Sequence, residues 1–277
     1  MLCPICKCKL FIDNKTYKCI NKHSFDIAKE GYLNLLISKK NAGDTKESTL
    51  ARLNFQEKGY YDFLGKELAT IISNKSNSFD ILDLGCGVGY YDKFISCKSL
   101  IGLDISKNAI QRASKHNKNY LYVVGSNAEI PFEDNSFDVV FSIFAPIFIK
   151  EVKRVLKPGG ILIKVSPGIN HLYELKERLY DNPYLNTEDN VEYSGFDSQS
   201  YTIKSKAIIN NEDIDNLIKM NSKYKKNKLL LVKLLSAQQT FSVISSLSWK
   251  FARMQISLSM MVFQSLKELV LPVCEDK

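Results

Sequence analysis

The feature that most constrains the fold is the run ILDLGCGVGYY, which begins at Ile81 and ends at Tyr91. Its first residues are apolar and favour a β-strand, and three glycines then follow at alternate positions: Gly85, Gly87 and Gly89. Glycine permits a tight turn and lets a ligand approach the backbone closely. A glycine turn by itself is a weak signal, so the rest of the chain has to decide its meaning.

Short apolar segments alternate with helical segments after this turn. We expect strands at Phe79–Leu84, Leu100–Leu103, Tyr120–Val124, Phe137–Phe144 and Ile161–Val165. We expect helices directly after the glycine turn, at Lys107–His116 with Ser106 as N-cap, and at about Lys150–Leu156 before a Pro-Gly-Gly stop. This alternation predicts an α/β fold with a parallel, doubly wound sheet.

The flanking segments are less regular. Residues 38–47 are polar and read as a linker, and Ser48–Ser73 has helical spacing that Gly59 interrupts. Residues 184–228 are polar and ambiguous. Residues 229–264 are apolar enough to complete the sheet or to form a covering helix, and periodicity does not separate these two alternatives.

Carboxylates and an amide surround the predicted glycine turn. Asp83 ends the first strand, Asp104 ends the second, where it can accept hydrogen bonds from ribose hydroxyls, and Asn127 follows the third. The turn lacks the Gly-Lys-Ser/Thr of a phosphate-binding loop, and Tyr90 replaces the last glycine of a dinucleotide fingerprint. A ligand without phosphate, such as S-adenosylmethionine, therefore fits best; the alternative is that both aspartates only cap helices. The expected cofactor site comprises Asp83, Gly85, Cys86, Gly87, Val88, Gly89, Tyr90, Asp104, Ile105, Asn127 and Ala128.

A cysteine cluster marks residues 1–36 as a small separate unit. Cys3 and Cys6 form a C-x-x-C pair, and Cys19 and His23 follow after a short spacer. This spacing is typical of a tetrahedral, structural zinc site, and so short a unit could hardly hold together without metal. Cys8 breaks the spacing and is expected to be free. The alternative is a group of buried or redox-active thiols.

Charge and targeting signals bound the partners and the compartment. The net charge of +8 favours a polyanionic partner. The N-terminus lacks the features of a secretory signal, and the apolar stretch Met254–Phe263 is too short to span a bilayer. We therefore expect a cytoplasmic protein with no membrane partner, whose cysteines are thiols or metal ligands.

Two levels of resemblance follow from these motifs. Asp83–Gly87, Phe137–Val140 and Leu156–Gly160 resemble the motifs of class I methyltransferases, whose fold implies a Rossmann-like, seven-stranded sheet with a reversed last strand. More specifically, the chain resembles the 23S ribosomal RNA (guanine-N1)-methyltransferases over roughly residues 3–180. The matching segments are Cys3–Leu36, Gly43-Asp44, Ala51-Arg52, Gly59–Tyr61, Ile81–Tyr91, Ile101–Ile110, Phe144–Pro146 and Pro167–Leu172.

This resemblance implies a function and a domain layout. The target is a guanine in the helix 35 hairpin loop, methylated at N1, and one branch of the family confers resistance to macrolides such as tylosin. Zinc would be held by Cys3, Cys6, Cys19 and His23, and Tyr61, Gly87–Gly89 and His171 would surround the cofactor. A homodimer is also implied. The zinc-binding domain would cover residues 1–36, and the methyltransferase domain would cover residues 37–277, with a linker and leading helix at 37–77 and the Rossmann-like core at 78–277.

The catalytic residues are not declared by any motif. Phe144 and Pro146 lie where this fold meets its substrate, and Phe144 could stack on the guanine or simply pack under the sheet. His171, Glu129 and Glu133 are the candidates for a general base. The chain differs from the family at Met220-Asn221-Ser222, where Met-Thr-Pro is usual. Two rival functions stay open: a weak or inactive ribosome-binding relative, and a methyltransferase of small molecules.

Overall fold

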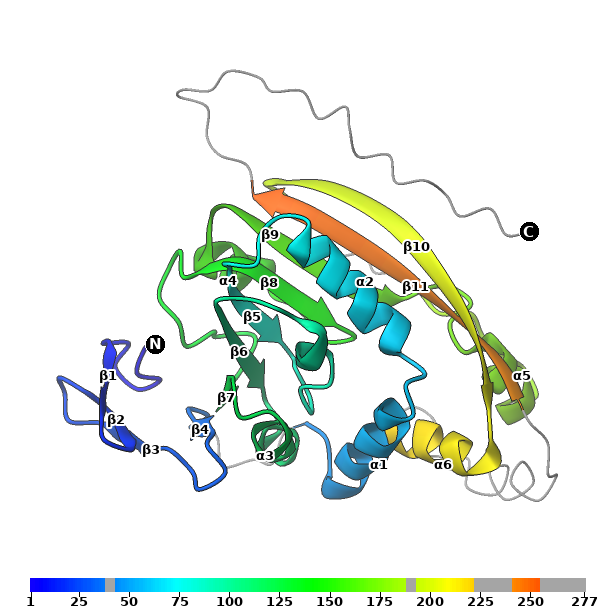
Figure 1. The fold of residues 1–277 in the computed structure, drawn as a ribbon, viewed down its shortest axis with the longest axis horizontal. Helices are drawn as coiled ribbons and strands as arrows, with labels where there is room; N and C mark the ends of the chain where they lie inside the picture. The colour runs from blue at the N-terminus through cyan, green and yellow to red at the C-terminus, as the bar shows by residue number, and fades with distance from the viewer. Residues whose placement is uncertain (38–42, 188–192, 222–240, 255–277) are drawn as a thin grey trace.

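The computed structural model describes residues 1–37, 43–187, 193–221 and 241–254. Its strands form two sheets, a small one at the N-terminus and a large one that makes up the body of the molecule (Figure 1). Residues 38–42, which are the first part of the predicted linker, lie outside the described residues, as do residues 188–192, 222–240 and 255–277 of the C-terminal region.

The small sheet is an antiparallel ribbon. It contains β1 (Leu10–Asp13), β2 (Thr16–Cys19) and β3 (Ser24–Asp26), in that order. Most of its side chains are exposed or half-buried, and Cys3, Leu10 and Cys19 are the buried apolar ones. So few buried side chains cannot hold the ribbon together unaided, and this agrees with a metal as its centre.

The large sheet has the strand order β10-β11-β9-β8-β5-β6-β7-β4. Its strands are β4 (Leu33–Asn34), β5 (Asp80–Leu84), β6 (Ser99–Asp104), β7 (Leu121–Val124), β8 (Phe137–Ile143), β9 (Leu156–Pro167), β10 (Phe196–Ile209) and β11 (Phe241–Met254). Strand β11 runs antiparallel to both neighbours, and the pairs among β4 to β9 are parallel. The predicted class I sheet with a reversed last strand is therefore confirmed, and the strand alternative for residues 229–264 holds where they are described.

One strand adds to the expected seven. Leu33 and Asn34 pair in parallel with Val123 and Val124 of β7, and the backbone N–H of Leu35 donates to the carbonyl of Val124 at 2.9 Å. The side chain of Leu33 is fully buried. Two residues are too few for a periodic pattern, so sequence spacing does not reveal this strand. Strand β4 ties the end of the N-terminal segment to the edge of the large sheet.

The helices are short. They are α1 (Lys46–Glu57), α2 (Asp62–Ser73), the 3-10 turn η1 (Tyr91–Phe94), α3 (Lys107–His116), α4 (Ile149–Val155), α5 (Tyr173–Leu179) and α6 (Asn211–Met220). Gly59 breaks the predicted long helix into α1 and α2, with φ of +82°. Within the described ranges no helix is long and apolar enough to span a membrane.

The prediction of a full helix after the glycine turn is wrong. Only the four residues of η1 are helical there. Asp92, which is fully buried, accepts a hydrogen bond from the Tyr122 hydroxyl at 2.7 Å, and this contact pins the chain close to the sheet. Strand β6 then begins at Ser99, so too few residues remain for further helical turns.

The apolar core lies on both faces of the large sheet. On one face Ile81, Phe141 and Ile163 pack with residues of α1, α2, α5 and α6. On the other face Leu82 and Val140 pack with α4 and with the N-terminal ribbon. Successive strand residues point to opposite faces, so β5, β8 and β9 are buried on both sides. The carboxyl ends of these strands are thereby held at one edge.

Candidate functional site

The glycine turn follows β5 at the carboxyl edge of the sheet. Gly85, Gly87 and Gly89 have φ of +83°, +56° and +69°, conformations that favour glycine. A Cβ at Gly85 would lie 2.3 Å from the Cβ of Ala145, so packing also requires glycine there. At Gly87 the nearest atom to a Cβ would be Cδ of Arg52 at 3.8 Å. Gly87 therefore faces open space, where a ligand can approach its backbone.

Asp104 lies at the end of β6 and holds the turn. Its carboxylate accepts the backbone N–H of Gly87 at 2.9 Å and that of Ser106 at 2.7 Å. Burial raises the pKa of Asp104, and these two hydrogen bonds oppose that shift. A carboxylate has about four acceptor positions, so positions remain for the hydroxyls of a ribose.

A pair of buried carboxyl groups lies beneath the turn. Burial raises the pKa of Asp83 well above its ordinary value, and the charges of Asp92 and Asp104 raise it further. Burial also raises the pKa of Asp92 to about 6, although the hydrogen bond from Tyr122 lowers it. Two such groups cannot both ionise cheaply in a buried site. A cationic ligand above the turn would favour their ionised form.

A cavity opens over these groups. It is lined by Gly43, Asp44, Arg52, Gln56, Asp83, Gly85, Cys86, Gly87, Val88, Tyr91, Asp104, Ala109, Ile143, Phe144, Ala145 and Pro146. Eight of the predicted site residues thus share one cavity. Gly89 and Tyr90 line a different cavity instead. Ile105 is exposed beside Gly43, and Ala128 is exposed at the sheet edge.

Three aromatic rings meet at one end of this cavity. Phe144 stacks on His171 with ring centroids 5.7 Å apart, and Tyr61 meets Phe144 edge-on at 6.0 Å. The Tyr61 hydroxyl lies 3.5 Å from Nε2 of His171. Burial, with Lys176 nearby, lowers the pKa of His171 to about 4, so its ring is neutral at pH 7. Tyr61 and His171 are therefore not in the cavity lining themselves, but both contact Phe144, which is.

The loop after β8 has an unusual backbone. Phe144 has φ of +59°, a strained value for a residue with a bulky side chain, and its side chain is 37% exposed. The carbonyl of Ala145 accepts hydrogen bonds from Lys164 and Ser142, and the carbonyl of Pro146 accepts one from Nδ2 of Asn127 at 3.0 Å. Oδ1 of Asn127 is buried and has no partner among the described residues. An unsatisfied acceptor at this point fits a ligand that carries an amino group.

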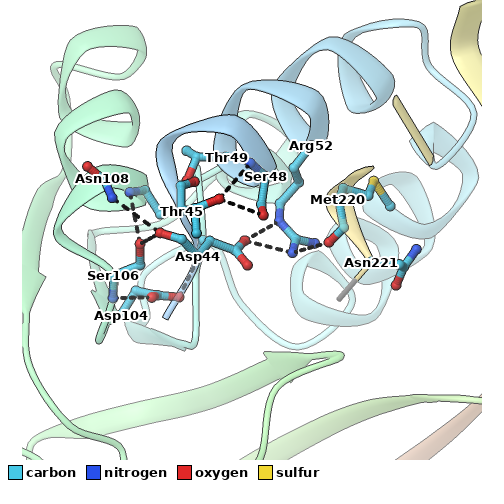
Figure 2. A network of polar contacts seen from close by, with 12 residues as sticks. Asp44, Thr45, Ser48, Thr49, Arg52, Asp104, Ser106, Asn108, Met220 and Asn221 are labelled. Carbon is cyan, nitrogen blue, oxygen red and sulfur yellow. Dashed lines mark hydrogen bonds and ion pairs between the residues drawn. The ribbon is translucent and has the colours of Figure 1, made fainter. Parts of the chain in front are cut away.

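Sequence reasoning gave no role to Asp44, Arg52 or Gln56. Figure 2 shows Asp44 between Arg52 on one side and Ser106 with Asn108 on the other. The Asp44 carboxylate accepts two hydrogen bonds from Arg52, at 2.9 and 2.7 Å, and its backbone carbonyl accepts from Ser106 and Asn108. The helical spacing of Arg52 and Gln56 was the signal that could have indicated a shared face.

The four predicted metal ligands converge in the ribbon. Their ligand atoms lie within 4.8 Å of one another. Nδ1 of His23 is 3.5 Å from Sγ of Cys3 and 3.4 Å from Sγ of Cys19, and the sulfurs of Cys6 and Cys19 are 3.6 Å apart. Zinc bond lengths imply ligand separations of about 3.5 to 3.8 Å in a tetrahedral site. The residues present therefore fit a zinc ion.

Two similar turns present these ligands. In the first, the N–H of Cys3 bonds the carbonyl of Cys8, and Lys7 has a left-handed backbone. In the second, the N–H of Cys19 bonds the carbonyl of His23, and Lys22 is left-handed. The backbone N–H of Cys8, followed by His23, lowers the pKa of Cys6 to about 5, which favours the thiolate that binds zinc. Cys8 itself lies outside the four-residue cluster.

Known proteins share both parts of this architecture. A zinc-ribbon family model described as "RlmA, N-terminal" matches residues 1–42, and a "Methyltransferase domain" model matches residues 82–164. YxjB of Bacillus subtilis, provisionally named a 23S rRNA (guanine-N(1)-)-methyltransferase, is 37% identical over 67% of this chain and 72% of its own. The chain belongs to the 23S ribosomal RNA (guanine-N1)-methyltransferase family.

Other members of the 23S ribosomal RNA (guanine-N1)-methyltransferase family agree with this assignment. The 23S rRNA (guanine(748)-N(1))-methyltransferase of Streptomyces fradiae is 33% identical over 64% of this chain and 66% of its own length. The protein is thus an S-adenosylmethionine-dependent methyltransferase with a zinc ribbon. The two predicted cofactors, S-adenosylmethionine and zinc, are thus confirmed for the protein. The individual residues that contact them stay predictions.

Proposed function

We propose that the protein methylates N1 of a guanine in 23S ribosomal RNA, within the hairpin loop of helix 35. The observation that carries this proposal is the pairing of two features in one chain. A Cys-Cys-Cys-His cluster is packed against the same sheet whose carboxyl edge holds the glycine turn and the aromatic cluster. Two relatives, 37% and 33% identical to this chain, are named as 23S rRNA (guanine-N1)-methyltransferases.

The proposal assigns roles to the residues around both sites. Cys3, Cys6, Cys19 and His23 would hold the zinc ion. The turn Gly85–Val88 and the carboxylate of Asp104 would hold the cofactor, with Asn127 free to accept a hydrogen bond from the adenine amino group. Tyr61 and His171 would act through Phe144, at the end of the cavity where the methyl group is transferred.

The reaction requires an unpaired base. The bound cofactor supplies a methyl group on a positively charged sulfur. N1 of guanine lies on the Watson–Crick edge and carries a proton, so the base must be outside a duplex and must lose this proton. Phe144 is exposed, strained and fixed by its neighbours, and we assign it as the surface on which the guanine stacks, beside Pro146.

His171 supports this surface as a positioning residue. Its neutral ring stacks on Phe144, and Nδ1 is buried without a partner among the described residues. A pKa of about 4 makes it a weak base at pH 7. Glu129 forms an ion pair with Lys7, and Glu133 forms one with Lys9. The N1 proton would therefore pass to solvent water, and the protein would contribute by orienting the base beside the sulfonium without a dedicated general base.

The class of partner follows from the same proposal. The substrate would be a polyanion, which agrees with the net charge of +8. A homodimer remains a prediction of the family resemblance, and a cytoplasmic location remains a prediction from the N-terminal sequence and the short apolar stretch Met254–Phe263.

The test is to map 23S ribosomal RNA from cells with and without this gene by mass spectrometry. We expect one N1-methylguanine in helix 35 that disappears with the gene and returns with a plasmid copy. A Phe144→Ala copy should restore little methylation, because stacking is worth about 1–3 kcal/mol per base. An unchanged hairpin would refute the assignment. The inactive relative and the small-molecule enzyme would then be separated by whether the purified protein binds cofactor.

A further inference from the structure

One face of α1 is turned toward the cofactor cavity. Arg52 and Gln56 are four residues apart on this helix, so their side chains lie one above the other. Both line the cavity that also contains Gly87 and Asp83. Among the lining residues that the structure describes, Arg52 is the only cation.

Arg52 is held in position but keeps hydrogen-bonding capacity. Its Nε and Nη2 donate to the Asp44 carboxylate, and Nη2 also donates to the carbonyl of Met220 at 3.2 Å (Figure 2). No contact of Nη1 is found among the described residues, and a guanidinium has five N–H donors in a rigid plane. Arg52 can thus receive a second carboxylate while Asp44 continues to orient it.

Gln56 supplies an acceptor one helical turn away. Its side chain is only 6% exposed, and its Oε1 is buried without a hydrogen-bond partner in the part of the chain that the structure describes. Such a buried, unsatisfied carbonyl oxygen is costly and points to a donor that is not part of the protein. A donor from a ligand in the cavity would satisfy it.

A cation next to an unsatisfied acceptor matches an amino-acid zwitterion, whose carboxylate and ammonium share one carbon atom. S-adenosylmethionine ends in this group. We propose that Arg52 binds the carboxylate and Gln56 the ammonium of the cofactor's amino-acid end. This inference rests on the proposed function, because it needs that cofactor in this cavity.

The surroundings agree with this assignment. Asp44 is fixed by Ser106 and Asn108 through its backbone carbonyl, and the N–H of Ser106 bonds Asp104. Asp104, proposed for the ribose, and Arg52, proposed for the carboxylate of the amino-acid end, are therefore linked by one hydrogen-bonded network (Figure 2). Asp83 in the same cavity adds a carboxyl group that an ammonium ion would favour in its ionised form.

The experiment measures binding by titration calorimetry with three ligands. They are S-adenosylhomocysteine, its analogue without the carboxylate, and its analogue without the amino group. The proteins are the full-length wild type, Arg52→Met, Arg52→Lys, Gln56→Leu and the control Arg112→Met, which alters an arginine of α3 outside the cavity lining. Melting temperatures show whether each variant is folded.

Each variant should lose affinity only for ligands with the matching group. Arg52→Met should bind S-adenosylhomocysteine about 10- to 100-fold more weakly than the wild type does. It should bind the analogue without the carboxylate with the same affinity as the wild type. Arg52→Lys should retain part of this preference, and Arg112→Met should match the wild type. Gln56→Leu should weaken the two amine-bearing ligands about 10-fold, and leave the deaminated analogue unchanged.

Two outcomes would overturn the inference. Equal loss for all three ligands in folded Arg52→Met would mean that Arg52 acts only through Asp44 and Met220. Unchanged affinities in Arg52→Met and Gln56→Leu would mean that neither residue meets the ligand. Failure of the wild type to bind any of the three ligands would instead refute the proposed cofactor site itself, so the two failures are distinguishable.

Discussion

At the scale of single residues, the site concentrates strain and unsatisfied polar atoms. Phe144 adopts a left-handed backbone that costs of order 1–2 kcal/mol, and Nδ1 of His171, Oδ1 of Asn127 and Oε1 of Gln56 are buried without partners among the described residues. These features are costly for folding and useful for binding. They mark where a ligand completes the structure.

His171 should make stability depend on pH. Its pKa of about 4 in the folded protein lies below the unfolded value of about 6.5, so its contribution is present above pH 6.5 and is lost as the pH falls toward 4. The free energy of unfolding that is lost in this way amounts to about 3 kcal/mol. The free energy of unfolding can be measured by chemical denaturation at pH 7 and at pH 4.5. Between these pH values it should fall less in His171→Gln than in the wild type.

The matched control for this change is His116→Gln, which removes an exposed histidine at the end of α3. Between pH 7 and pH 4.5, His116→Gln should lose as much free energy of unfolding as the wild type does. If His171→Gln and the wild type lost equal stability between the two pH values, burial of a neutral imidazole would not be the cause.

At the scale of elements, the ribbon depends on its metal and covers part of one face of the large sheet. The ribbon contacts the loop after β7, where the N–H of Leu2 donates to the carbonyl of Pro131 at 2.9 Å. Arg154 of α4 fixes the same loop through the carbonyls of Ile130 and Phe132. Loss of the ribbon would therefore uncover part of one apolar face of the sheet.

Zinc removal should unfold the ribbon before the body. Cys3→Ser should abolish bound zinc, whereas Cys8→Ser should retain one zinc ion per chain, as measured by elemental mass spectrometry. The binding energy of a structural zinc, about 10–16 kcal/mol in small peptides, is much of the folding energy of such a unit. Hydrogen exchange in Cys3→Ser should become fast in β1, β2 and β3 and stay slow in β5. Loss of zinc in Cys8→Ser would contradict the ligand assignment.

At the scale of the whole molecule, net charge and sheet geometry act together. The chain carries 38 Lys and Arg against 30 Asp and Glu, and the parallel strands place the site at one exposed edge. A long substrate such as RNA can reach this edge, and an excess of positive charge attracts it.

Binding of the isolated hairpin should therefore weaken steeply with salt. Each neutralised phosphate releases counterions, so six or more contacts would lower the affinity at least about 10³-fold between about 50 and 200 mM salt. Fluorescence anisotropy of a labelled helix 35 hairpin measures this slope. A nearly flat response would argue against RNA as the substrate. Binding of S-adenosylhomocysteine serves as the control, because a partly buried ion pair is screened much less.

Local signals determined the elements of this protein and the kind of site it has. The glycine spacing, the strand that precedes it and the cysteine spacing are short-range patterns, because turns and metal knuckles are built from neighbouring residues. They sufficed for the parallel α/β sheet, the break at Gly59 and the four residues that converge in the ribbon, whereas the reversed last strand was expected from the family resemblance.

Only the tertiary structure decided which distant residues meet. Strand β4 is too short to have a period and forms because Leu33 is buried against the sheet. The short η1 reflects the contact of Asp92 with Tyr122, thirty positions along the chain. Arg52 and Gln56 look like surface residues of a helix until that helix packs over the glycine turn. Burial and long-range contact are properties of the packed chain, and no local pattern encodes them.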